Sequence, residues 1–208
     1  MANSSWLPRA LEESRARGFL GPSEIQLQIT HAEGFAHCWH EHFKEAPTSF
    51  LDLGSGGGLP GLVLLERWRC RALLLDSMVK RTVFLREVLC WPGAPISGEV
   101  VLGRAEEYAR TLDATESFDL VTARSFGPPA VTVECGVRFL KVGGLLVVSE
   151  PPLDDDGQRW DDAGLRELRM KSLGRVRHGA AYQILQKTAP TPGAYPRTIG
   201  TPTKHPLF

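Results

Sequence analysis

Five short apolar runs lie between residues 49 and 150, and each is followed by a stretch with helix-like spacing. The runs read SFLDL, RALLLD, SGEVVL, FDLVTA and GGLLVVSE. Apolar strands that alternate with amphipathic helices are typical of a parallel sheet with helices on both faces. The intervening helices are expected at about residues 59–67, 78–91, 105–111 and 129–140, the last beginning at a proline that suits a helix's first turn.

The two ends of the chain follow other patterns. Helical spacing over residues 6–17 and 25–43, interrupted by a glycine- and proline-containing turn, predicts an amino-terminal helical cap. After an acidic connection and a helix expected at about residues 158–168, the runs LRMKSLGRVRHG and AAYQILQKT predict an antiparallel hairpin around Gly179. The chain is therefore expected to form an α/β fold with a seven-stranded, mostly parallel sheet.

Length and composition favour one globular domain. The 208 residues, 42% of them hydrophobic, are enough for one sizeable core, so we expect a single domain over residues 1–208. Its parts would be a helical cap (1–46), an α/β core (47–188) and a basic tail rich in proline and glycine (189–208). No apolar run approaches the ~18 residues of a membrane span, and no signal peptide is evident, so a cytoplasmic monomer without membrane contact is expected.

Residue types that often hold metals are present but poorly spaced. The four cysteines are scattered without a CxxC pair, which favours reduced thiols over disulfides or a zinc site. Four of the six histidines cluster within residues 31–42, but they do not share one helix face. No bound metal is therefore expected.

Charge is unevenly distributed, although 24 basic and 24 acidic residues balance over the whole chain. From residue 164 to the carboxyl terminus, eight Lys or Arg accompany the single acid Glu167, which leaves minus seven on the first 163 residues. Such a basic part indicates either an anionic partner, such as a nucleic acid, or a solvated face.

The stretch FLDLGSGGGLPG joins the first apolar run to the next helix. This loop contains three glycines, Gly54, Gly56 and Gly58, and also Ser55. The glycines allow a sharp turn and let the backbone amides approach a ligand. A dinucleotide fingerprint has the spacing GxGxxG, whereas Leu59 stands at the third position and the spacing is GxGxG. The loop therefore predicts a ligand other than NAD.

Two acids at strand ends indicate the chemistry of this ligand. Asp52 precedes the loop, where its carboxylate could accept hydrogen bonds from the amino group of a methionine moiety. Asp76, followed by Ser77, ends the second strand, where acids meet ribose hydroxyls in doubly wound nucleotide sites. The pair favours S-adenosylmethionine as the cofactor, and Asp76 could also cap the following helix.

Five motifs together resemble one bacterial family. In order, they read DLGSGGGLPG, LLLDSMVKRTVFLREV, GRAEE, VTARSF and YPRTIGTPTKHPL. From Phe50 to its carboxyl terminus the chain resembles the "glucose-inhibited division B" family, the 16S ribosomal RNA methyltransferases that make 7-methylguanosine. The resemblance implies a class I, Rossmann-like methyltransferase fold, S-adenosylmethionine as cofactor, and ribosomal RNA or the small ribosomal subunit as partner.

The resemblance also implies roles for individual residues. Gly54 and Leu59 would contact the cofactor, and Arg124 would line its pocket close to the reacting methyl group. The residues bordering the adenine would be Ala105 and Glu106, and those in RNA-facing basic motifs would be Lys80, Arg81, Arg197 and Lys204. Each of these four cations could instead be a surface charge, and Glu106 a first-turn acid favoured by the helix dipole. An unpaired Arg124 at the end of a buried strand would be costly, which favours a functional or paired role.

The expected chemistry needs alignment rather than a base, because guanine N7 already has an exposed lone pair. Amino-nitrogen methyltransferases commonly carry an Asp/Asn-Pro-Pro-aromatic motif after the fourth strand, whereas this chain has TARSF there. Methylation of cytosine C5 would need a cysteine nucleophile near the same cleft, and no suitable cysteine lies there. We therefore predict that Arg124 orients a guanine as the catalytic residue while the glycine loop holds the methyl donor.

Two segments depart from the family pattern and leave alternatives open. EIQLQITHAEGFAHCWHEHF replaces the usual Asn-Leu-Thr motif, and SEPP at residues 149–152 replaces a Leu-Lys-Gly type of ending. A methyltransferase of this kind could act on a small molecule or a protein, and salt-sensitive RNA binding would distinguish these substrates. A non-catalytic module that binds RNA and senses the cofactor would keep the pocket without turnover.

Overall fold

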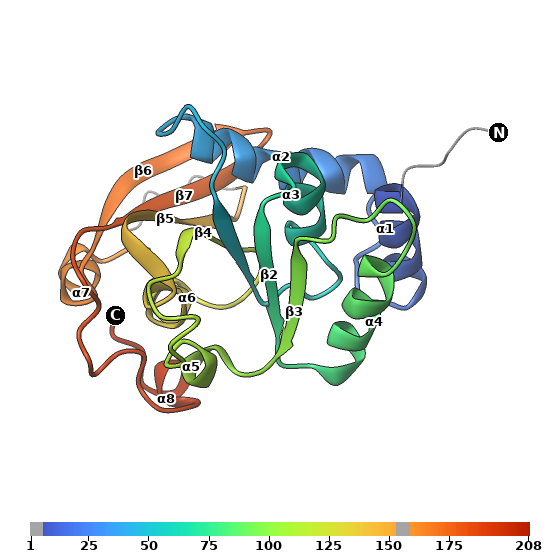
Figure 1. Ribbon diagram of the computed structural model, residues 1–208. Helices are drawn as coiled ribbons and strands as arrows, with labels where there is room; N and C mark the ends of the chain where they lie inside the picture. The colour runs from blue at the N-terminus through green and yellow to red at the C-terminus, as the bar shows by residue number, and fades with distance from the viewer. Residues whose placement is uncertain (1–5, 153–158) are drawn as a thin grey trace.

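The computed structural model describes residues 6–152 and 159–208, which form a seven-stranded sheet with helices on both faces (Figure 1). The strand order is β3-β2-β1-β4-β5-β7-β6. The strands are β1 (Ser49–Leu53), β2 (Arg71–Asp76), β3 (Gly98–Leu102), β4 (Phe118–Ala123), β5 (Leu140–Glu150), β6 (Met170–His178) and β7 (Ala180–Lys187).

The first five strands run parallel, and the direction of winding reverses between β1 and β4. β1 pairs with β2 and with β4, so that Asp52 lies between Leu74 and Thr122. β7 runs antiparallel to β5 and β6, which confirms the hairpin expected around Gly179. The predicted seven-stranded, mostly parallel α/β sheet is thus confirmed, and its winding reverses at the kind of position where open sheets bind ligands.

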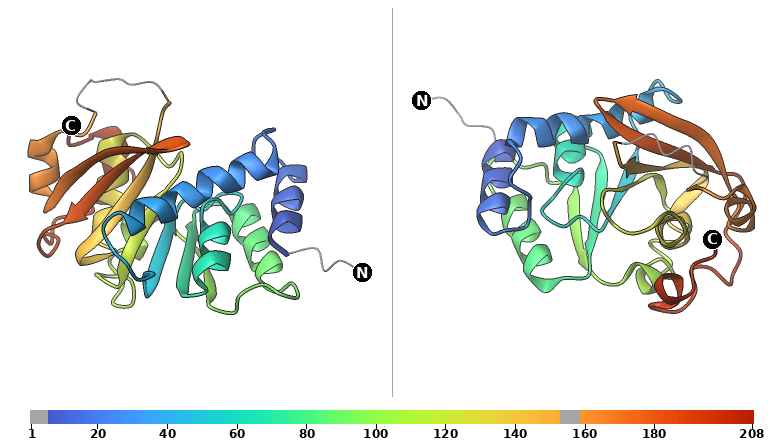
Figure 2. Two further views of the ribbon diagram at one scale, coloured as in Figure 1. Left: turned by 90° about the horizontal axis from the view of Figure 1, so that it is seen from above. Right: turned by 180° about the vertical axis from the view of Figure 1, so that it is seen from behind.

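Helices cover the two faces unequally. One face carries α1 to α4 and the other carries α5, α6 and α7, as the two views of Figure 2 show. Alternate strand residues supply the two cores: Leu51 and Leu53 face α6, whereas Phe50 faces α2 and α3. The helices are α1 (Trp6–Ala16), α2 (Ile25–His40), α3 (Gly61–Trp68), α4 (Val79–Leu89), α5 (Ala105–Tyr108), α6 (Pro129–Val137), α7 (Asp162–Glu167) and α8 (Thr201–Lys204).

Several predicted helices end before the expected residue, among them α2 at His40 and α4 at Leu89, and the ends of two others have a visible local cause. The helix expected at 105–111 ends at Tyr108, because the Thr111 and Thr115 hydroxyls bond to nearby backbone carbonyls and favour turns. The helix expected to reach residue 140 ends at Val137, and Leu140 already pairs with β4. In both places a local alternative for the backbone ends the helix.

The last two helices show what the sequence pattern missed. α7 begins at Asp162, one residue after Asp161, whose carboxylate accepts a 2.6 Å hydrogen bond from the Gly164 amide. The expected start of this helix at residue 158 lies outside the described residues. α8 was not expected, since it is a single turn inside a segment rich in proline and glycine. Within residues 6–152 and 159–208, no helix has the length and apolar character needed to cross a membrane.

Candidate functional site

The glycine loop, residues 54–60, connects β1 to α3 at the carboxyl end of the sheet. Gly54 has φ = 72°, a left-handed conformation that other residues rarely adopt, and a Cβ there would lie 2.7 Å from the Phe126 ring. The amides of Gly54 and Ser55 donate to the Leu75 carbonyl of β2 at 2.9 and 3.0 Å. The loop is therefore folded back against the ends of the neighbouring strands.

The amino-terminal cap rests on this loop. Ser14 of α1 donates a buried 2.8 Å hydrogen bond to the Gly57 carbonyl. Leu59 is buried in an apolar cluster with Leu7 of α1 and Leu62 of α3. The cap thus helps to fix the loop conformation from the side of the sheet that carries α1 to α4.

Asp52 lies beneath the loop and is 1% exposed. One carboxylate oxygen accepts from the Gly61 amide at 3.0 Å, and the other accepts from the Thr122 hydroxyl at 2.9 Å. The Ser55 hydroxyl donates to the Asp52 backbone carbonyl at 2.9 Å. Burial raises the pKa of Asp52 to about 6, although these hydrogen bonds oppose the shift. Its contacts join β1, β4 and the start of α3.

Asp76 holds the loop from the neighbouring strand. One of its oxygens accepts from the Gly56 amide at 2.9 Å, and the other accepts from the Met78 amide at 2.8 Å just before α4. The Arg81 guanidinium approaches the first oxygen at 3.6 Å. Asp76 therefore organises both the loop and the start of α4 while keeping lone pairs available, because each carboxylate oxygen can accept two hydrogen bonds.

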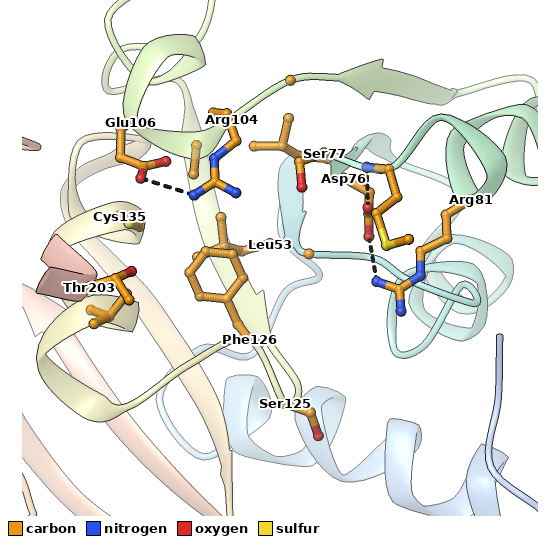
Figure 3. A pocket seen from close by; sticks show the side chains of 16 residues that line it. Leu53, Asp76, Ser77, Arg81, Arg104, Glu106, Ser125, Phe126, Cys135 and Thr203 are labelled. Atoms are coloured by element: carbon orange, nitrogen blue, oxygen red, sulfur yellow. Dashed lines mark hydrogen bonds and ion pairs between the residues drawn. The ribbon is translucent and has the colours of Figure 1, made fainter. Parts of the chain in front are cut away.

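A pocket of about 330 Å³ opens beside these residues. In Figure 3, Asp76, Ser77 and Arg81 lie on one side, Glu106, Cys135 and Thr203 lie on the other, and Phe126 lies between them. The apolar part of the wall comes from strand ends and from α6. It includes Leu53, Leu75, Phe126 and Val131.

Apart from Arg124, the predicted cofactor residues divide into two groups. Those lining the pocket are Gly54, Asp76, Ser77, Ala105 and Glu106. Those lying in or beneath the glycine loop, away from the pocket wall, are Asp52, Ser55, Gly56, Gly58 and Leu59. Contact of either group with a cofactor stays a prediction.

Arg124 follows β4 but does not line this pocket. It turns towards α2, where its Nη2 donates to Gln28 Oε1 at 3.3 Å. Its Nη1 and the Nε2 of His31 are both buried, and neither has a hydrogen-bond partner within residues 6–152 and 159–208. Burial and the Arg124 charge lower the pKa of His31 to about 4, so this imidazole is neutral at physiological pH. The pair presents unsatisfied polar groups near the strand end.

The four predicted RNA-facing cations have different environments. The Lys80 and Lys204 side chains are exposed and form no ion pair or hydrogen bond with the part of the chain that the structure describes. Arg81 lines the pocket beside Asp76. Arg197 is different, because it is bonded to the buried Glu134. RNA contact by any of the four stays a prediction.

Residues 149–152, which depart from the family pattern at the end of β5, accept hydrogen bonds from other parts of the chain. Glu150 accepts from the Trp160 indole at 3.1 Å and from the Arg159 guanidinium. Arg175 and Arg177 donate to the backbone carbonyls of Pro151 and Pro152, each at 2.7 Å. Glu150 is therefore a paired acid rather than an isolated negative charge beside the site.

Several pocket residues lie inside the motifs but were not singled out by sequence reasoning. Arg104 directly precedes Ala105, Phe126 ends VTARSF, and Thr203 lies in the tail motif. Their positions next to motif residues are the signal that could have indicated them. Cys135, one α6 residue in the wall, carries no such signal.

The two buried cysteines, Cys38 and Cys135, have thiols of low reactivity. Burial raises the pKa of the Cys135 thiol well above its usual range and that of Cys38 to about 12, so both stay protonated. Within the described ranges, no three side chains of His, Cys, Asp or Glu are grouped so that they could hold a metal ion.

Sequence comparison identifies relatives over most of the chain. A family model described as "rRNA small subunit methyltransferase G" matches residues 34–157. Proteins named ribosomal RNA small subunit methyltransferase G include one from Symbiobacterium thermophilum, 35% identical over 76% of this chain and 69% of its own length. Another, from Moorella thermoacetica, is 31% identical over 91% of this chain and 87% of its own length.

Solved structures resemble the chain in fold. The SAH-bound methyltransferase PaMTH1 of Podospora anserina superposes with a TM-score of 0.60, at 18% identity and 88% coverage of both chains. A SAM-dependent methyltransferase from Methanosarcina mazei superposes with a TM-score of 0.55, at 15% identity, over 73% of this chain and 97% of that one. These likenesses show the class I methyltransferase fold.

Proposed function

Because the chain belongs to the rRNA small subunit methyltransferase G family, we propose that it transfers a methyl group from S-adenosylmethionine to N7 of a guanine in small-subunit ribosomal RNA. The observation that carries the proposal is the pocket at the carboxyl ends of β1, β2 and β4, with a carboxylate at the end of β2. Ligands of doubly wound sheets bind at this end of the strands.

The pocket residues fit a nucleoside carrying a thioether or sulfonium group. Asp76 has remaining lone pairs for ribose hydroxyls, and Leu75, Phe126 and Val131 offer apolar surface to a purine. Gly54 leaves room beside the Phe126 ring that a Cβ would fill. When bound, S-adenosylmethionine supplies an electrophilic methyl group.

Asp52 acts on this site through the loop. Its carboxylate is occupied by the Gly61 amide and the Thr122 hydroxyl, and it is buried away from the pocket wall. These contacts favour a positioning role, in which Asp52 fixes the loop that presents its backbone to the methyl donor.

Arg124 and His31 are suited to orienting the acceptor. A buried guanidinium nitrogen and a buried imidazole nitrogen without partners are costly, and a polar group of the substrate could satisfy both. The neutral His31 could accept or donate one hydrogen bond, while Arg124 would donate to a guanine oxygen or a phosphate. No general base is required, because N7 carries its own lone pair.

The test is a labelling experiment on the natural substrate class. Purified protein would be incubated with labelled S-adenosylmethionine and small ribosomal subunits from a strain lacking this gene, and the digested RNA would be analysed by mass spectrometry. Labelled 7-methylguanosine is expected. Cofactor binding without label in RNA would contradict the proposal and would favour another acceptor or a non-catalytic role.

Matched variants connect the activity to the site. Arg124→Ala should abolish turnover while the fold and cofactor affinity are retained, because Arg124 lies outside the pocket wall. Arg166→Ala, which removes an exposed arginine of α7, is the control. Full activity of Arg124→Ala would contradict its role in orienting the acceptor.

A further inference from the structure

Three acids bind the backbone of the carboxyl-terminal segment, residues 189–208. Glu116 accepts from the Thr191 amide at 3.1 Å, Glu134 from the Arg197 amide at 2.8 Å, and Glu106 from the Gly200 amide at 3.1 Å. The segment has little regular structure of its own, so side chains from distant elements satisfy its backbone groups.

The strongest of these attachments is the pair between Glu134 and Arg197. Glu134 is completely buried in α6, and the Arg197 Nε and Nη2 donate to its two oxygens at 2.9 and 2.6 Å. The same Nη2 donates to the His205 carbonyl at 2.8 Å, and the hydrogen bonds to Glu134 raise the pKa of Arg197. Such bidentate, charge-assisted pairs are both strong and geometrically specific.

Glu134 and Arg197 each lie close in the sequence to residues that line the pocket. On α6, Val131 lies three residues before Glu134 and Cys135 directly follows it, and both line the pocket. On the segment, Arg197 precedes α8, and Thr203 of α8 lines the same pocket on the side shown with Glu106 in Figure 3. Glu106 itself is 4% exposed and joins Gly200 to the pocket wall.

We infer that Arg197 is a positioning residue that, through Glu134, holds the carboxyl-terminal segment as one wall of the cofactor pocket, rather than a ligand of RNA phosphate. This inference rests on the proposed function, since it takes the pocket to bind S-adenosylmethionine. An RNA ligand needs available donors, whereas the Arg197 fork is already bonded to a buried carboxylate. The exposed Lys204, next to Thr203, has the free charge that Arg197 lacks.

The test measures cofactor affinity and RNA affinity separately. The variants are Glu134→Gln, which preserves shape but removes the charge, Arg197→Lys and Arg197→Ala, and the double variant Glu134→Gln/Arg197→Ala. Isothermal titration with S-adenosylhomocysteine should show affinity weakened about tenfold or more in Glu134→Gln and Arg197→Ala, with the double variant no worse than the single ones. The salt dependence of RNA binding should stay unchanged, and Arg197→Lys should recover part of the affinity.

Asp119→Asn is the matched control. It removes another part-buried ion pair, with Lys141, at the amino ends of β4 and β5, away from the carboxyl-terminal segment. Its cofactor affinity should equal that of the parent protein even if its stability falls. A weakening as large as that of Glu134→Gln would mean that general destabilisation explains the effect, and it would overturn the inference.

Two further outcomes are decisive. Unchanged cofactor affinity in Arg197→Ala, together with a loss of about one unit of salt slope in RNA binding, would overturn the inference and assign Arg197 to RNA. If the variants do not fold, amide hydrogen exchange of the unaltered protein tests the inference instead. The cofactor should increase the protection of amides in residues 189–208, and no increase would overturn the inference. Absence of any cofactor binding by the unaltered protein would instead contradict the proposed function.

Discussion

Gly61, the first residue of α3, offers a sharp test of how tightly the glycine loop is held. A Cβ built at this position would lie 2.6 Å from Asp52 Oδ2 and 3.1 Å from Asp52 Cβ, and it would also contact Leu74 of β2. The Gly61 amide donates to the same Asp52 oxygen at 3.0 Å. Gly61→Ala must therefore move α3 away from the sheet or displace Asp52.

The magnitude follows from three contributions. Overpacking a tight core site costs about 1–3 kcal/mol. Weakening a buried, charge-assisted hydrogen bond to Asp52 costs about 1.5–3 kcal/mol if it is lost completely. Alanine recovers at most ~1 kcal/mol of helix propensity. We therefore expect Gly61→Ala to lower the free energy of unfolding by about 2–4 kcal/mol. This figure assumes that the hydrogen bond to Asp52 is weakened but not lost completely.

The assay is equilibrium unfolding in urea, read as the shift of the midpoint at constant slope. Gly136→Ala is the matched control: Gly136 lies in α6, and its Cβ would make only ordinary 3.5 Å contacts with Leu146 and Leu53. That variant should be neutral or up to about 1 kcal/mol more stable. Equal stability of the two variants would refute the view that Asp52 and Gly61 are in tight contact.

Other predictions concern pH, salt and the cap. The pKa of His31 is lowered to about 4, so the unfolded chain binds a proton before the folded protein does as pH falls below 6.5. The free energy of unfolding should therefore decrease by about 1–2 kcal/mol between pH 6.5 and pH 4, after allowance for the partial exposure of His31. His31→Gln should lack this decrease, as measured by urea unfolding at each pH. Asp52, whose pKa is raised to about 6, contributes with the opposite sign in both proteins, so only their difference reports His31. Lys80→Ala should reduce the salt slope of RNA binding by about one, and an unchanged slope would show that this lysine does not contact phosphate. Ser14→Ala should cost about 1 kcal/mol, because the Gly57 carbonyl loses a buried donor; stability equal to that of the parent would contradict this contribution of the cap.

Strands and helices could be predicted where the cause is local. The run RALLLD is apolar on both faces and ends in an acid, so its burial within the sheet and the position of Asp76 at the strand end follow from pattern alone. Helix ends were less predictable, because Thr111 and Thr115 offer the backbone hydrogen bonds that compete with the helix. α8 could not be predicted, since its placement depends on Glu106, which is 94 positions from Gly200.

The same distinction applies to the site. Gly54 and Ser77 belong to loops that directly follow strands, and such positions can be inferred from a strand pattern. The ion-pair partner of a charged residue cannot be inferred in this way, because it is distant in the sequence and comes close only in the folded protein. Arg197 and Glu134 are 63 positions apart, and nothing in the local sequence of either residue indicates the other.

The basic carboxyl-terminal part therefore offers less RNA-binding charge than its composition suggests. Lys187 is buried against Glu116, and Arg197 is bonded to Glu134. Two further arginines of β6 donate to backbone carbonyls after β5. Lys80 of α4 and Lys204 of α8 adjoin the pocket residues Arg81 and Thr203, which places exposed positive charge beside the pocket from two different elements. We therefore expect these two lysines to contribute phosphate contacts close to the pocket to the salt slope of RNA binding, besides any contacts made by the exposed Arg166, Arg169 and Lys171.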